Sequence, residues 1–161
     1  MSTFNGLPAH VLLVHFIVVL VPLTAALAVV CAIWRAARKR LIWFVVALAL
    51  ITVVLTPLTT SAGEWLEHRV GDSPALNTHT ELGDTLLYFS SALLVAVALL
   101  AFVHVRESRN RTLKPVAVWL ITAVVVLASG AATVQVYRIG DSGAKSTWNE
   151  QLQAHNGTDD S

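Results

Sequence analysis

The chain has 161 residues, of which 55% are hydrophobic and only 13% are charged, and its mean hydropathy is +0.66. A soluble domain carries about a quarter of its residues as charged side chains. This composition therefore indicates lipid as the main solvent and excludes an intrinsically disordered chain. The single cysteine, Cys31, excludes a disulfide framework, a CxxCH haem attachment and a metal site built from several thiolates.

Four apolar stretches stand out, at about residues 10–34, 41–62, 85–105 and 115–136. A helix crosses a bilayer with about 20 residues, so each stretch is long enough. Only helices and closed barrels satisfy the backbone in lipid, and these stretches lack the alternation of barrel strands. We therefore expect an all-α fold, a four-span transmembrane helix bundle over residues 1–148, followed by a flexible polar tail at 149–161.

The charges are divided between the two sides of the membrane. Eight of the eleven basic residues lie in RAARKR and RESRNRTLKP, the connections that we expect after the first and third spans. Nine of the ten acidic residues lie on the other side, with Glu107 as the exception. The positive-inside rule places the basic connections in the cytoplasm and both termini outside. Topology and anionic lipid explain these short connections, so no nucleic-acid partner is expected.

Polar side chains gather at the span ends that we expect outside. His15 is the most informative, because it lies five residues after His10, about 7 Å deeper along the helix, among apolar neighbours. An imidazole inside a span is costly. His15 is therefore expected to contact a polar group on another helix, to bind haem or a metal, or to relay protons. His10 is shallower, and an interfacial position explains it most simply.

The other candidates flank the second and third spans. His79 precedes the third span and has no capping role, whereas Glu81 in the first turn complements the helix dipole. His79 is either a solvated histidine or the partner of His15. Glu64 and His68 lie four residues apart, so they share a face if the second helix continues past the span. That spacing suits a metal site as well as an ordinary exposed helix.

The fourth span is followed by YRIGDSGA, residues 137–144. Arg138 in this segment could pair with Asp141 or another acid, or hold a propionate or phosphate in a bidentate contact. Gly140 and Gly143 predict a tight loop that folds back over the bundle.

Three functions suit this pattern. The one we favour is a small electron-transfer protein that binds b-type haem through His15 and His79, with His10 and Arg138 as further cofactor-binding residues. The second is a non-catalytic accessory subunit of a larger respiratory membrane complex. The third is a metal-binding or transport protein, whose ligands would be the polar residues of the outer side: His15, His79, Glu64, His68 and Asp141. The chain has no HExxH, P-loop or GxGxxG motif, so hydrolysis and nucleotide chemistry have no support, and whether it is an enzyme stays open.

Three motifs carry a resemblance to a known family: GLPAHVLLVHF at 6–16, THTELGD at 78–84 and YRIGDSGA at 137–144. Together they resemble the bacterial membrane-protein family known as domain of unknown function 2231. The positions that match the family motifs are His10, His15, His79, Gly83, Arg138, Gly140, Ser142 and Gly143. Val11 and Asp141 depart from the motifs, which have proline and histidine at these positions.

The resemblance implies a four-span domain in the bacterial cytoplasmic membrane. It also implies redox partners, because relatives are fused to Rieske iron–sulfur or cytochrome c modules. A quinone, an iron–sulfur protein, a cytochrome or a larger membrane complex are therefore the expected partners besides the lipid bilayer, and a homo-oligomer is compatible with the sequence.

Overall fold

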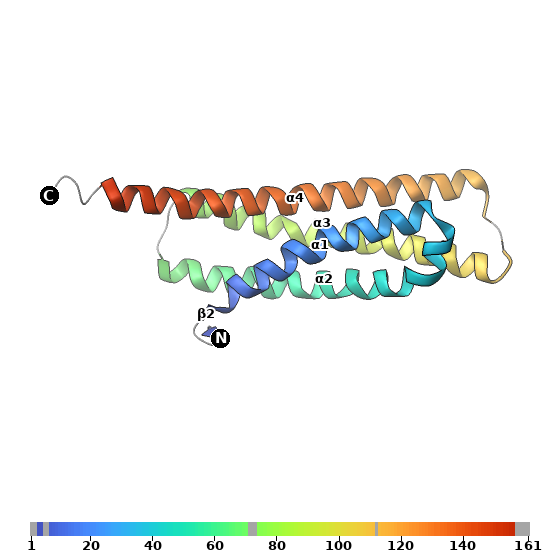
Figure 1. Ribbon diagram of the computed structural model, residues 1–161, viewed down its shortest axis with the longest axis horizontal. Helices are drawn as coiled ribbons and strands as arrows, with labels where there is room; N and C mark the ends of the chain where they lie inside the picture. The colour runs from blue at the N-terminus through green and yellow to red at the C-terminus, as the bar shows by residue number, and fades with distance from the viewer. Residues whose placement is uncertain (1–2, 5–6, 71–73, 112, 157–161) are drawn as a thin grey trace.

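Four long helices form nearly all of the described chain (Figure 1). The computed structural model describes residues 3–4, 7–70, 74–111 and 113–156, with side chains for 13–64, 77–111 and 113–145. A short antiparallel strand pair comes first, followed by the helices; in chain order the elements are β1 (Thr3–Phe4), β2 (Leu7–Pro8), α1 (Ala9–Ile33), α2 (Arg35–Val70), α3 (Pro74–Ser108) and α4 (Pro115–Asn156).

The helices are arranged as an up-and-down bundle. Consecutive helices run in opposite directions and pack together, and α4 also packs against α1, so that α1 and α3 lie at opposite corners (Figure 1). We call the end that holds Trp34 and the start of α4 the basic end, and the end that holds the start of α3 the acidic end.

Each helix contains a stretch that is long and apolar enough to cross a membrane: Leu13–Ile33, Arg35–Glu64, Asn77–Ser108 and Pro115–Lys145. This confirms the predicted four-helix membrane architecture. All four helices exceed the minimum of about 20 residues for crossing. Helix α1 has 25 residues, whereas α2, α3 and α4 have 36, 35 and 42. At a rise of 1.5 Å per residue, α4 is about 63 Å long, roughly twice the thickness of a hydrocarbon core.

Our prediction of a loop after the fourth span is wrong. Helix α4 continues through Gly140 and Gly143 to Asn156, so residues 149–156, which we expected in a flexible tail, are helical. A glycine inside a helix costs about 1 kcal/mol relative to alanine. Here the helix gains the ion pair between Lys145 and Asp141, one turn apart at 2.7 Å, and it packs against the start of α3.

Small and aliphatic side chains fill the interior, whereas many of the large hydrophobic side chains face outward. Ala28, Ala96 and Ala132 are completely buried, while Phe16 and Leu127 are mostly exposed. Lipid tails are as apolar as these side chains, so burial from water does not drive the helices together in a membrane. Close packing over small residues, together with interhelical hydrogen bonds, therefore holds the bundle together.

Buried threonine hydroxyl groups inside the spans are satisfied by their own helices, whereas Oγ of the buried Ser129 on α4 has no hydrogen-bond partner among the described residues. Thr24, Thr52 and Thr56 are buried, and each donates a hydrogen bond of 2.7–2.8 Å to the carbonyl oxygen four residues earlier. The backbone amide and the hydroxyl can share one carbonyl, so a threonine adds no unsatisfied group to the membrane interior.

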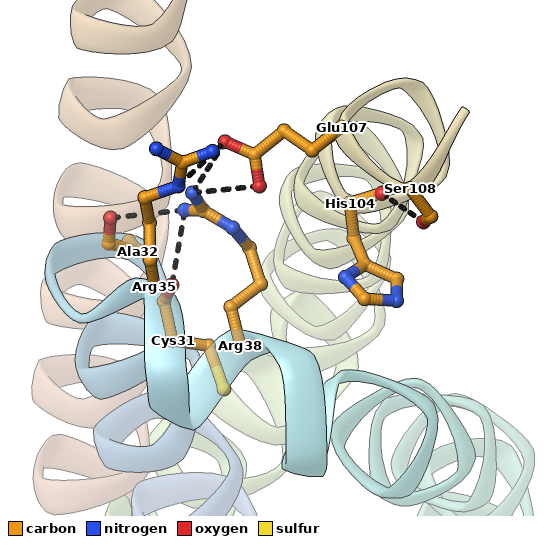
Figure 2. Close-up of polar contacts among 7 residues, drawn as sticks. All are labelled: Cys31, Ala32, Arg35, Arg38, His104, Glu107 and Ser108. Atoms are coloured by element: carbon orange, nitrogen blue, oxygen red, sulfur yellow. Dashed lines mark hydrogen bonds and ion pairs between the residues drawn. The ribbon is translucent and has the colours of Figure 1, made fainter. Parts of the chain in front are cut away.

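The basic end begins with a corner of one residue. Trp34 alone separates α1 from α2, so RAARKR forms the first turns of α2, and our prediction of a loop there is wrong. The last carbonyls of a helix lack intrahelical donors. Arg38, only 2% exposed, supplies donors for α1: its Nη1 donates to the carbonyl oxygens of Cys31 at 3.2 Å and Ala32 at 3.3 Å (Figure 2).

The same guanidinium joins the corner to α3. Nη2 of Arg38 donates to both carboxylate oxygens of Glu107, at 3.0 and 3.2 Å, and Nε of Arg35 lies 3.3 Å from Oε1 (Figure 2). The side chain of Glu107 is 14% exposed. A carboxylate that is removed from water needs a nearby positive charge to offset the free-energy cost of its desolvation. Glu107, the one acidic residue on the basic side, is therefore the interhelical partner of two arginines.

We predict that Arg38→Met lowers the free energy of unfolding by about 3 kcal/mol, because it leaves Glu107 without its main buried partner. Thermal or denaturant unfolding of the purified protein in detergent micelles measures this loss. Arg40→Met is the matched control, since Arg40 is exposed on the same helix. Equal stability of the two variants would contradict the assigned role of Arg38.

Candidate functional site

His79 forms the best-defined polar contact at the acidic end. It lies in the second turn of α3, and its Nδ1 is 3.1 Å from the carbonyl oxygen of Ile139 and 3.0 Å from Oγ of Ser142, both on α4. A carbonyl oxygen only accepts hydrogen bonds, and Ser142 itself donates to the Ile139 carbonyl at 2.9 Å. We infer that Nδ1 carries the proton in the neutral ring, which makes Nε2 the basic nitrogen.

Gly143 provides the surface on which this ring lies. A Cβ atom at Gly143 would stand 3.0 Å from Cε1 and 3.2 Å from Nδ1 of His79, closer than ordinary van der Waals contact. A Cβ atom at Gly140, one turn earlier, would meet nothing within 4 Å. The need for glycine at position 143 therefore comes from the imidazole, and His79 and Gly143 bring the second and third sequence motifs into contact.

A buried glutamine continues the same contact between α3 and α4. Gln135 is only 3% exposed, and its Nε2 donates to Oγ1 of Thr85 at 2.6 Å and to the Leu82 carbonyl oxygen at 3.2 Å. We refer to His79, Thr85, Gln135, Ser142 and Gly143 as the α3–α4 seam. Sequence reasoning did not single out Gln135, although a lone amide in the apolar fourth span was a visible signal.

His15 lies elsewhere on the bundle. Its side chain is exposed on α1, next to Phe16, which is 61% exposed. The described partners of His79 are on α4, and α1 lies at the corner opposite α3. The pairing of His15 with His79 therefore stays a prediction. His10 and His68 fall within α1 and α2, but their side chains lie outside the described residues.

The remaining candidates are on the surface. Glu64, Arg138 and Asp141 are exposed, and the described partner of Asp141 is Lys145 rather than Arg138. Within residues 13–64, 77–111 and 113–145, no three histidine, cysteine, aspartate or glutamate side chains gather to hold a metal ion. His104 is at the other end of the molecule, where its ring meets Trp43 edge to face at 6.4 Å between centroids.

The geometry can hold one imidazole in a fixed orientation and tautomer. A histidine whose Nδ1–H is bonded to a backbone carbonyl presents Nε2 as a ligand or a proton acceptor. Arg138 lies one helical turn before Ser142, so both residues lie on one side of α4. The site therefore combines a positioned nitrogen base with a cation at the acidic end of the bundle.

One family of known proteins matches nearly the whole chain. The family model described as "Predicted membrane protein (DUF2231)" matches residues 6–156, a range that includes all three sequence motifs. No curated protein and no solved structure matches the chain.

We predict that Gly143→Ala destabilises the protein by about 1–2 kcal/mol, because the added methyl group displaces a ring held by two hydrogen bonds. Gly140→Ala is the matched control and should be neutral or stabilising by up to about 1 kcal/mol through its higher helix propensity. Unfolding of both variants in the same detergent measures the difference. If Gly143→Ala were as stable as Gly140→Ala, the ring would not constrain position 143.

Proposed function

We propose a redox function for this chain, which belongs to the DUF2231 family of predicted membrane proteins. In this proposal it is an electron-transfer protein of the bacterial cytoplasmic membrane and binds b-type haem. The observation that carries this proposal is the bond from Nδ1–H of His79 to the Ile139 carbonyl oxygen. Ligating histidines nearly always donate their second ring N–H to a carbonyl, carboxylate or water, which fixes the tautomer and raises the basicity of the ligating nitrogen. Nε2 of His79 would then hold the haem iron.

The neighbouring residues fit such a group. Gly143 leaves room for the imidazole face, and Ser142 and Ile139 hold its orientation. Arg138, exposed on the same side of α4, would pair with a haem propionate. In this proposal His10 or His15 of α1 would supply the second histidine to the haem. When bound, the haem supplies a one-electron redox centre, and the protein sets its orientation and its access to partners.

We also propose that the acidic end faces the periplasm and the basic end the cytoplasm. The support is the excess of Lys and Arg around Trp34 and in the connection from α3 to α4. A haem held by His79 would then lie on the periplasmic side, within reach of a quinone, an iron–sulfur protein or a cytochrome as partner.

Reporter fusions test this orientation. Alkaline phosphatase fused after Ser161 should be active, because that enzyme matures outside the cytoplasm, whereas the same reporter fused after Arg111 should be inactive. The reverse pattern would place the basic end outside and would remove the periplasmic assignment of His79.

A visible spectrum tests the haem. The protein purified from bacterial membranes, with hemin added if haem is substoichiometric, should show a Soret band that His79→Gln abolishes. His104→Gln is the control, because His104 lies at the opposite end of α3, and it should keep the band. A folded protein that stays colourless with hemin, or a His79→Gln variant that retains the full band, contradicts the proposal.

The second candidate is a non-catalytic accessory subunit of a larger membrane complex. It is favoured by the seam itself, in which His79 and Gln135 already serve as hydrogen-bonding groups between helices. The exposed imidazole of His15, among outward-facing apolar residues, would then contact a neighbouring subunit. A colourless protein that co-purifies with a respiratory complex would select this function over electron transfer.

A further inference from the structure

The basic end contains a cleft that neither electron transfer nor the α3–α4 seam uses. It has a volume of about 400 Å³ and is lined by the ends of all four helices and by Leu113 of the last connection. Arg35, Arg38 and Glu107 are the charged residues of its polar part, which also includes Thr122. Ile33 and Trp119 belong to its apolar part, and both side chains are mostly exposed.

The polar part carries an excess of positive charge. Two guanidinium groups share the single carboxylate of Glu107 (Figure 2). Arg38 is almost completely buried, yet its Nε has no hydrogen-bond partner among the described residues. Arg35 uses only Nε toward Glu107, and in the described part of the chain its two Nη atoms donate to no protein group. The cleft therefore offers one uncompensated positive charge and several hydrogen-bond donors to an anion.

The position of the cleft favours an amphiphilic anion as its ligand. Trp34, between α1 and α2, and Trp119, near the start of α4, are both exposed at this end, as expected for aromatic rings at a membrane interface. Basic pockets between transmembrane helices are suited to lipid headgroups. The guanidinium groups provide the fork that matches phosphate oxygens, while the apolar side chains provide a wall for an acyl chain.

We propose that this cleft binds the phosphate of an anionic phospholipid from the leaflet at the basic end. The phosphodiester accepts hydrogen bonds from Arg35 and lies over the Arg38–Glu107 pair, and one acyl chain follows Ile33 and Trp119 along α1 and α4. A zwitterionic lipid is disfavoured, because its ammonium group adds a positive charge next to two arginines. The proposal is independent of haem binding, which concerns the acidic end.

Native mass spectrometry of the full chain released from micelles tests the site, with phosphatidylglycerol and phosphatidylcholine as the two probes. Wild-type protein should retain phosphatidylglycerol preferentially. Arg35→Gln should weaken its binding about five-fold, the effect of one basic group near an anionic lipid. Arg40→Gln is the matched control, because it removes the same charge from an exposed position of α2 outside the cleft.

Glu107→Gln is a second variant, for which we expect the opposite effect on lipid retention. It removes the negative charge from the cleft and should strengthen the retention of phosphatidylglycerol, and its unfolding temperature shows whether the bundle is intact. Equal losses in Arg35→Gln and Arg40→Gln would overturn the proposal, as would equal retention of the two lipids by the wild type. Displacement of the lipid by millimolar inorganic phosphate would identify a free-phosphate site instead.

Discussion

The buried guanidinium of Arg38 is the constraint on which the rest of the bundle depends. The last carbonyl groups of every helix lack intrahelical hydrogen-bond donors. Arg38 donates to those of α1, where a one-residue corner leaves little room for water. The same group pairs with Glu107 on α3. Three helices thus meet at one charged side chain, which sets where α1 ends, where α2 begins and how α3 lies beside them.

The two ends of the bundle use different chemistry to join helices. At the basic end the contacts are charged, and they hold α1, α2 and α3 together. Along the α3–α4 seam they are neutral hydrogen bonds from imidazole, hydroxyl and amide groups. Neutral polar groups are far cheaper to bury than charges. The seam can therefore continue along the helices toward the membrane interior, whereas the ion pairs stay near the water interface.

The sequence was sufficient to predict the four spans, because a run of about 20 apolar residues has few other uses. It also singled out His79. It could not predict the partners of His79, which lie about 60 residues away, or the pairing of Arg38 with Glu107. The orientation of His15 was equally hidden, because α1 is apolar on all sides and its pattern does not indicate a buried face. The two glycines of YRIGDSGA favoured a loop, because the intrinsic conformational preference of glycine takes no account of the contacts between α3 and α4 that exist in the folded protein.

The separation of Arg38 from Glu107 has a consequence for how the protein is made. The two partners are 69 positions apart in the sequence, so the hairpin of α1 and α2 is synthesised before Glu107. Until α3 is present, Arg38 lacks Glu107, although its guanidinium can already donate to the carbonyl oxygens of Cys31 and Ala32. The ion pair that joins the α1–α2 corner to the third helix is therefore a late contact in the order of synthesis, formed only when both halves of the chain are present.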